Sequence, residues 1–295
     1  MHRHNVHNST LKAVHSVRTL FSAFAGIAAV VLFCVAVPAL WLDQHVVQEE
    51  GFIELAAPLG SDPQFQSQLA DATADTVIAD ADFAPGLAEL VRPLVEGAAE
   101  SLTDHPEYQE AWNETLRRSH ELTFAAETQP AEAQGGGAIT LDIAPLVALV
   151  TEDAVQAIGT DIPVPPQVLV GLGQADQGRA IQFIENYAGL AVPFAAASGV
   201  AFVLAMAIAR RRSTTLLLIG FGVALSAGLW KLGTEFAVRQ VSASSDENAL
   251  AGLFKDYFVS TAESSFNAWI IASAGAGIIM MLLGLIARIF AGSRT

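Results

Sequence analysis

Four apolar stretches constrain this chain more than any other feature of its sequence. Each is about as long as a helix that crosses the ~30 Å hydrocarbon core of a bilayer, which takes roughly 20 residues. None of them contains Asp, Glu, Lys or Arg, except for Lys231 near the edge of the third stretch. The sequence therefore predicts four transmembrane helices, at residues 20–42, 188–209, 214–232 and 268–287.

Basic residues predict how these spans are oriented, because Lys and Arg beside a span usually stay on the cytoplasmic side. Eight basic residues flank the spans on one side: Arg3, Lys12, Arg18, Arg210, Arg211, Arg212, Arg288 and Arg294. This pattern predicts cytoplasmic tails at residues 1–19 and 288–295, the first of them mobile. It places the segment 43–187 and a loop at 233–267 outside the cytoplasm.

The segment 43–187 is strongly acidic. It carries 25 acidic residues against four basic ones, a net charge of −21, whereas the whole chain has a net charge of −15. Such a field repels nucleic acid and anionic headgroups, and it tolerates cations and basic partners. We therefore expect an exported acidic domain whose partners are the lipid bilayer and a membrane or envelope protein, with no nucleic acid.

The first span is expected to stay in the mature protein. Its 23 apolar residues exceed the roughly 7–15 of a signal peptide, although Val37 and Ala39 are small enough for a cleavage site. The single cysteine, Cys34, lies within this span, so the sequence offers no disulfide framework.

Helix signals dominate the acidic segment. The run Ser61-Asp62-Pro63-Gln64 predicts a cap and a helix that ends near residues 80–85. A similar signal at Asp104-His105-Pro106-Glu107 predicts a helix over 107–126. Between them the apolar spacing predicts a helix at 86–102, interrupted by Pro93.

After a glycine-rich loop at 127–137, the pattern predicts a strand at 138–142, a helix at 143–158 and a strand at 167–172. The two strands are expected to pair. From about Ala175 the apolar pattern continues into the second span, which predicts one unbroken helix. The expected fold class is mainly α: four transmembrane helices plus an extracytoplasmic, mostly helical domain with a short two-stranded element.

Three short motifs resemble those of a group of actinobacterial integral membrane proteins of uncharacterised function. They are Ala57-Pro58-Leu59 before Ser61-Asp62-Pro63, the set Trp112, Arg117 and His120, and Leu141-Asp142-Ile143 before Pro145-Leu146-Val147. The resemblance covers roughly residues 18–210. It implies an N-terminal span, an exported helical domain and further spans, and it brings no catalytic assignment. This chain has Leu116 where the group usually has Asn.

The candidate ligand-binding residues are Trp112, Arg117 and His120. All three lie on one predicted helix, and His120 follows Arg117 by three residues, so these two side chains are expected to share a face. The alternative is structural: Trp112 fills the core, while Arg117 and His120 satisfy buried carbonyl or carboxylate groups.

Two sets of residues resemble metal ligands. The acidic set fits no EF-hand spacing and is better explained as a solvated face, and the histidine set lies in a tail without preformed geometry. The sets are Asp71, Asp75, Asp80, Asp82, Glu89 and Glu96, and His2, His4 and His7. We predict neither a metal site nor a cofactor.

No sequence motif indicates catalysis. The chain lacks a G-x-S-x-G elbow, a P-loop, an H-E-x-x-H run and paired C-x-x-C. Spans without internal ionisable residues argue against a transporter acting alone. The sequence favours a non-enzymatic envelope protein whose outer domain binds a partner or ligand. The alternatives are a membrane sensor that acts through a partner, and an enzyme or carrier for lipids or cell-wall precursors.

Overall fold

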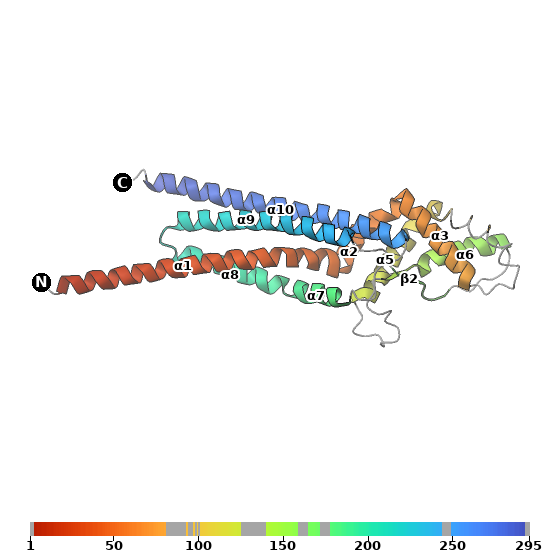
Figure 1. Cartoon of the computed structure of the whole chain (residues 1–295), viewed down its shortest axis with the longest axis horizontal. Coiled ribbons are helices and arrows are strands. Elements are labelled where there is room, and N and C mark those ends of the chain that lie inside the picture. The colour runs from red at the N-terminus through yellow and green to blue at the C-terminus, as the bar shows by residue number, and fades with distance from the viewer. Residues whose placement is uncertain are drawn as a thin grey trace. The chain divides into compact units, whose positions relative to one another are not determined.

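A computed structural model describes most of the chain as two compact units (Figure 1). The bundle unit comprises Met1–Asp43, Tyr187–Arg239 and Glu263–Thr295, and the domain unit comprises Gln44–Asn186 and Gln240–Ala262. The described residues are mainly helical with one two-stranded sheet, which confirms the expected fold class. They are 3–80, 93, 97, 99, 101–124, 140–158, 165–171, 178–243 and 249–292.

Four helices are long and apolar enough to cross a bilayer, as the sequence predicts. Their apolar parts run side by side in the bundle unit (Figure 1). The four helices are α1 (Arg3–Leu42), α8 (Ala191–Ile208), α9 (Arg212–Ser242) and α10 (Ala249–Gly292). Because α1 begins at Arg3, the tail that was expected to be mobile is helical from that residue onward.

The exposed apolar side chains support the membrane assignment. Of the 28 large hydrophobic residues that are exposed in the described part of the chain, 25 belong to the bundle unit. The domain unit has only Leu169, Phe183 and Val241 in this set. A bundle that turns its apolar side chains outward is stable in lipid and not in water. The chain is therefore a multi-pass membrane protein.

The helix before the second span is interrupted, contrary to the expectation of an unbroken helix. α7 (Gly178–Gly189) and α8, which begins at Ala191, are separated by one residue, Leu190, which forms a turn. The cause is Pro193, whose nitrogen has no hydrogen to donate to the Gly189 carbonyl four residues earlier. Its ring also crowds that carbonyl, so a continuous helix is unfavourable here.

Serine side chains join α1 to α8 in both directions. Ser22 Oγ on α1 donates to the Ala205 carbonyl at 3.0 Å, and Ser198 Oγ on α8 donates to the Ala29 carbonyl at 2.9 Å. Helices in lipid lack a hydrophobic force between them, so close packing and hydrogen bonds of this kind hold them together.

Glycines allow α9 and α10 to approach closely. A Cβ atom added to Gly277 would lie 2.7 Å from the Gly220 carbonyl oxygen, and one added to Gly220 would lie 2.7 Å from the Gly277 carbonyl oxygen. No side chain fits at either position without a shift of backbone. Small residues at such contacts are typical of transmembrane helix pairs.

A tryptophan compensates for a proline inside α1. Pro38 cannot donate a hydrogen bond to the Cys34 carbonyl, which lies one turn earlier in the same helix. Trp230 Nε1, on α9, donates to this carbonyl at 3.0 Å. Its ring also packs against Phe33, with the two ring centroids 5.6 Å apart. The bond satisfies a carbonyl that would otherwise be unpaired in an apolar medium.

The domain unit is built around one apolar core. Its helices include α2 (Glu49–Ala56), α3 (Pro63–Asp80), α5 (Tyr108–Phe124) and α6 (Ala144–Ile158), joined by a π-helix η1 (Asp43–Val47) and the short 3-10 helices η2 (Ala57–Ser61) and η3 (Leu102–Asp104). Among the residues that the structure describes, the largest fully buried side chains lie in this core: Trp112, Phe65, Leu59, Leu69, Leu102, Leu116, Leu141, Ile143, Leu146, Val147 and Val150.

The segment 233–267, expected as a loop, is helical at both ends. α9 continues to Ser242 and α10 begins at Ala249, and Leu250 and Phe254 are buried in the domain core. The apolar residues of this part of α10 recur at helical spacing, with Tyr257 next on the same face. The connection between the third and fourth spans is therefore part of the domain.

The two predicted strands exist and pair. β1 (Thr140–Asp142) and β2 (Leu169–Gly171) are antiparallel, with Leu141 opposite Val170. The helix predicted after the Ser61–Gln64 signal is confirmed as α3 (Pro63–Asp80), and the one predicted over 107–126 is confirmed as α5 (Tyr108–Phe124). Asp62, not Ser61, caps α3, because its Oδ1 accepts bonds from the amides of Gln64 and Phe65. The expected helix at 86–102 and glycine loop at 127–137 lie largely outside the described residues.

The bond between Trp230 and the Cys34 carbonyl can be tested by a double-mutant cycle. Trp230→Phe removes the donor and keeps an aromatic ring, so we expect the protein to lose about 1 kcal/mol of stability. In a Pro38→Ala background the loss should be smaller, since the introduced alanine donates its own amide to the Cys34 carbonyl. Unfolding midpoints in detergent measure both. Equal losses in the two backgrounds would contradict the assigned role.

Candidate functional site

Trp112 lies in the centre of the domain core, on the buried face of α5. Its side chain is fully buried, its Nε1 donates to the Ala57 carbonyl at 3.1 Å, and its ring meets Phe65 edge-on at 5.3 Å. The ring also covers Gly60, where an added Cβ atom would overlap Trp112 Cδ1. Only glycine fits beneath the indole, so Trp112 fixes the corner between α2 and α3.

The Gly60 carbonyl is held from two sides in the same corner. Tyr108 Oη and Gln66 Nε2 each donate to it at 2.8 Å. Burial raises the pKa of Tyr108 to about 12, opposed by the neighbouring Gln66. The phenol therefore stays protonated at neutral pH and keeps its hydrogen for this bond. The residues 57–63 that carry the family resemblance thus form a packed corner.

His120 is also buried on α5, near its end. Its ring lies 5.2 Å from Phe52 and 4.6 Å from Phe124, between ring centroids, and its Nε2 is 3.2 Å from the Val46 carbonyl oxygen. Since a carbonyl only accepts, Nε2 carries the hydrogen and donates it. Burial lowers the pKa of His120, while the Val46 bond and the nearby Glu49 and Glu121 carboxylates oppose the shift.

Arg117 lies at the edge of α5 and faces solvent. Its side chain is 45% exposed and forms an ion pair with Glu114, one turn earlier on the same helix. Glu114 is shared with Arg118, whose Nε lies 2.7 Å from its other oxygen. An exposed pair of this kind contributes little stability.

The structure does not bring the three candidate residues to one point. Trp112 contacts the corner before α3, His120 contacts η1 and α2, and Arg117 contacts its own helix. The three-residue spacing predicted that Arg117 and His120 share one face of α5. In the structure His120 is on the buried side of the helix and Arg117 is on the exposed side. Trp112 in the core and His120 on a carbonyl have the contacts of the structural alternative, whereas Arg117 pairs with a partly exposed carboxylate and not with a buried one.

Asp142 organises the elements around β1, although it was not among the residues predicted to form a site. Its Oδ1 accepts bonds from the amides of Ala144 at 3.1 Å and Val168 at 2.9 Å. Its own amide donates to Ser119 Oγ on α5. One buried residue of β1 thus bonds to α5, to the first residue of α6 and to the residue before β2. The sequence did contain a signal for this role: an Asp at the end of a predicted strand, just before a predicted helix, is well placed to cap that helix.

The candidate metal ligands do not form a site where the structure describes them. Asp71 is exposed on α3, and no group of three or more potential metal ligands occurs among the described residues. The remaining members of both sets have side chains outside the described part: Asp75, Asp80, Asp82, Glu89, Glu96, His2, His4 and His7.

Comparisons with protein-family models, with curated proteins and with solved structures found no match for this chain. Its class therefore follows from its own geometry. It is a multi-pass membrane protein with a separate helical domain, and the buried polar side chains described above hold that domain together.

The buried His120 predicts a pH dependence of stability. The folded domain holds a neutral imidazole with a lowered pKa, whereas the unfolded chain protonates near the ordinary value of about 6.5. The free energy of unfolding should therefore fall as the pH drops below about 6.5, by at most about 1.4 kcal/mol per pH unit for one proton. Above that pH the imidazole is neutral in both the folded and the unfolded chain, so His120 does not make the free energy of unfolding depend on pH.

His120→Gln keeps a donor for the Val46 carbonyl and cannot titrate. We expect the variant to lose less stability than the wild type between about pH 7 and pH 5, as measured by thermal unfolding. The control is His105→Gln, which replaces a half-buried ring that accepts a bond from the Glu107 amide. If wild type and His120→Gln lost the same stability over this pH range, the pH dependence would not come from His120.

Proposed function

We propose that this protein is a non-enzymatic envelope protein of the cytoplasmic membrane. Both termini lie in the cytoplasm, and the acidic domain lies outside, where it binds a protein partner or ligand in an accessory or scaffold role. The distribution of charge supports this orientation: eight of the bundle's ten basic residues lie at its short connection, Arg210 to Arg212, or near the two chain termini, and only Lys231 and Arg239 lie elsewhere. The resemblance to the actinobacterial group supports the same arrangement.

The observation that carries the proposal is the contrast between the domain's interior and its surface. Inside, Trp112, His120 and Asp142 are all committed to packing or to backbone groups. Outside, acidic side chains face solvent. The exposed acidic residues of the described domain are Glu50, Glu54, Asp71, Asp104, Glu107, Glu110, Glu121, Glu152 and Asp256. Such a surface favours recognition of a partner with a basic face.

Three exposed acidic residues of this surface lie around the start of α5. Asp104, Glu107 and Glu110 are exposed, and no Lys or Arg occurs between Arg92 and Arg117 in the sequence. Glu114, by contrast, is neutralised by Arg117 and Arg118. The negative charge before Glu114 is therefore free to attract a partner, and we place the contact there.

Purification of the tagged chain at its native level in mild detergent, followed by mass spectrometry, tests the proposal. We expect one stoichiometric partner, reduced about tenfold by the double variant Glu107→Lys and Glu110→Lys, since opposed like charges weaken association. The matched control is Asp71→Lys with Glu152→Lys, which makes the same change of charge elsewhere on the domain and should retain the partner.

Two outcomes would overturn the proposal. One is a purified protein that turns over an envelope substrate and loses this turnover in His120→Gln or in a variant of a nearby acidic residue. The other is a partner whose recovery falls equally in both charge variants, because the contact would then depend on net charge alone.

A membrane sensor that acts through a partner is the second candidate. The observation that favours it is the continuity of α10. This single helix contributes Phe254 to the domain core, and its Phe266 packs on Trp41 and Trp230 in the bundle, with ring centroids 5.3 and 6.2 Å apart. Ligand-dependent crosslinking of the spans to another membrane protein would favour the sensor over the scaffold.

A further inference from the structure

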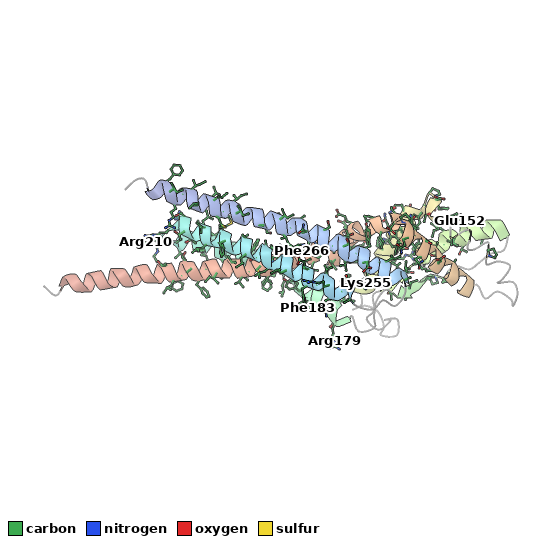
Figure 2. All side chains as sticks on the ribbon, turned by 45° about the horizontal axis from the view of Figure 1, so that its top comes forward. Glu152, Arg179, Phe183, Arg210, Lys255 and Phe266 are labelled. Carbon is green, nitrogen blue, oxygen red and sulfur yellow. The ribbon has the colours of Figure 1, made fainter. Side chains whose placement is uncertain are left out.

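A groove of about 760 Å³ lies between α1 and α9 in the bundle unit. Its volume is within the roughly 300–1,000 Å³ of known ligand sites. Arg210, Arg211 and Thr214 line one end, where the short connection from α8 enters α9, and Figure 2 shows Arg210 at this end of the bundle. Towards the middle of the helices the lining becomes apolar. The groove therefore has one cationic end and one apolar end.

The floor of the groove is set by two glycines. Gly222 on α9 lies against Val30 on α1, and an added Cβ atom would lie 2.7 Å from that side chain. Gly26 on α1 faces Ile219, which is buried among the helices. At these contacts α1 and α9 approach closely, and the groove lies beside them.

The apolar wall opens to the surroundings of the bundle. The side chains of Ile27, Val31 and Leu218 line the groove, and all three are more than half exposed. In a transmembrane helix such side chains face lipid. A molecule in the groove can therefore enter from the bilayer, with its apolar part along these residues.

The helical segments around the cationic end contain no acidic residue to neutralise it. No Asp or Glu occurs in residues 1–42, 186–234 or 264–295, which contain the four apolar stretches and the basic connection. Arg210 and Arg211 are both exposed. Their counter-charge must come from outside these segments, and an anion bound at two arginines beside threonine hydroxyls is the chemistry that fits.

The geometry points to an anionic phospholipid as the occupant: we propose that its phosphate binds at Arg210 and Arg211 and that an acyl chain lies along the apolar wall. A free phosphate leaves the apolar wall without a partner, and an apolar helix of another protein leaves the arginines without a counter-charge. A phospholipid fits both ends. The proposal does not depend on the function of the acidic domain.

Native mass spectrometry of the full chain in detergent, titrated with phosphatidylglycerol and separately with phosphatidylcholine, tests the site. We expect one preferred phosphatidylglycerol, bound at least about tenfold more tightly than phosphatidylcholine, because only the former has a net negative charge. The double variant Arg210→Gln and Arg211→Gln should remove this preference. Arg212→Gln with Arg288→Gln removes the same charge at positions that do not line the groove, and should keep it.

A steric variant tests the acyl-chain part without a change of charge. Ala23 lines the groove and is exposed, so Ala23→Trp fills space without displacing a packed side chain. We expect it to weaken phosphatidylglycerol binding about tenfold, as bulk does in an apolar pocket. Leu225→Trp, at an exposed position on α9 that does not line the groove, is the control and should bind as the wild type does.

Three results would overturn the proposal. Equal losses in the two arginine double variants would mean that net charge alone attracts the lipid. Unchanged binding in Ala23→Trp would place the lipid elsewhere on the bundle. Full competition by glycerol 3-phosphate at concentrations that saturate the arginines would show that the site takes a soluble phosphate and does not use the apolar wall.

Discussion

The need to satisfy every backbone polar group in an apolar medium shapes this bundle. Pro38 leaves the Cys34 carbonyl without a helical donor, and Trp230 from another helix supplies one. Tyr187 Oη also donates to a carbonyl of α1, that of Val35, at 2.7 Å. These bonds fix which helices are neighbours and at which height, and a purely apolar interface would fix neither.

Charge is separated along the chain as sharply as polarity. Eight of the bundle's ten basic residues lie where α8 meets α9 or near the two chain termini, while the segment 43–187 carries 25 acidic residues. The one ion pair described between α9 and α10 joins Lys231 to Glu263, with the two atoms 3.2 Å apart. The same separation supports a domain that attracts basic partners and a bundle whose arginines attract anionic lipid.

Local patterns predicted the elements well, and tertiary contacts decided the rest. The four spans, the paired strands and the helices at 63–80 and 108–124 follow from periodicity and capping. Two features did have a signal in the sequence that the predictions did not use. Pro193 indicates the helix break at Leu190. The spacing of Leu250, Phe254 and Tyr257 indicates that the chain is helical after Ala249. For the candidate residues, spacing gives the angle between Arg117 and His120, but only the packed core shows that His120 is buried and Arg117 is exposed.

The central claim is that the acidic domain and the basic connection of the bundle lie on opposite sides of the membrane. Cysteine labelling tests it most directly, because Cys34 is the only native cysteine and can be replaced by alanine. In that background, Glu107→Cys should react with a membrane-impermeant maleimide in intact cells, and Arg212→Cys only after the cells are opened. Reaction of Arg212→Cys in intact cells, or protection of Glu107→Cys until lysis, would contradict the account.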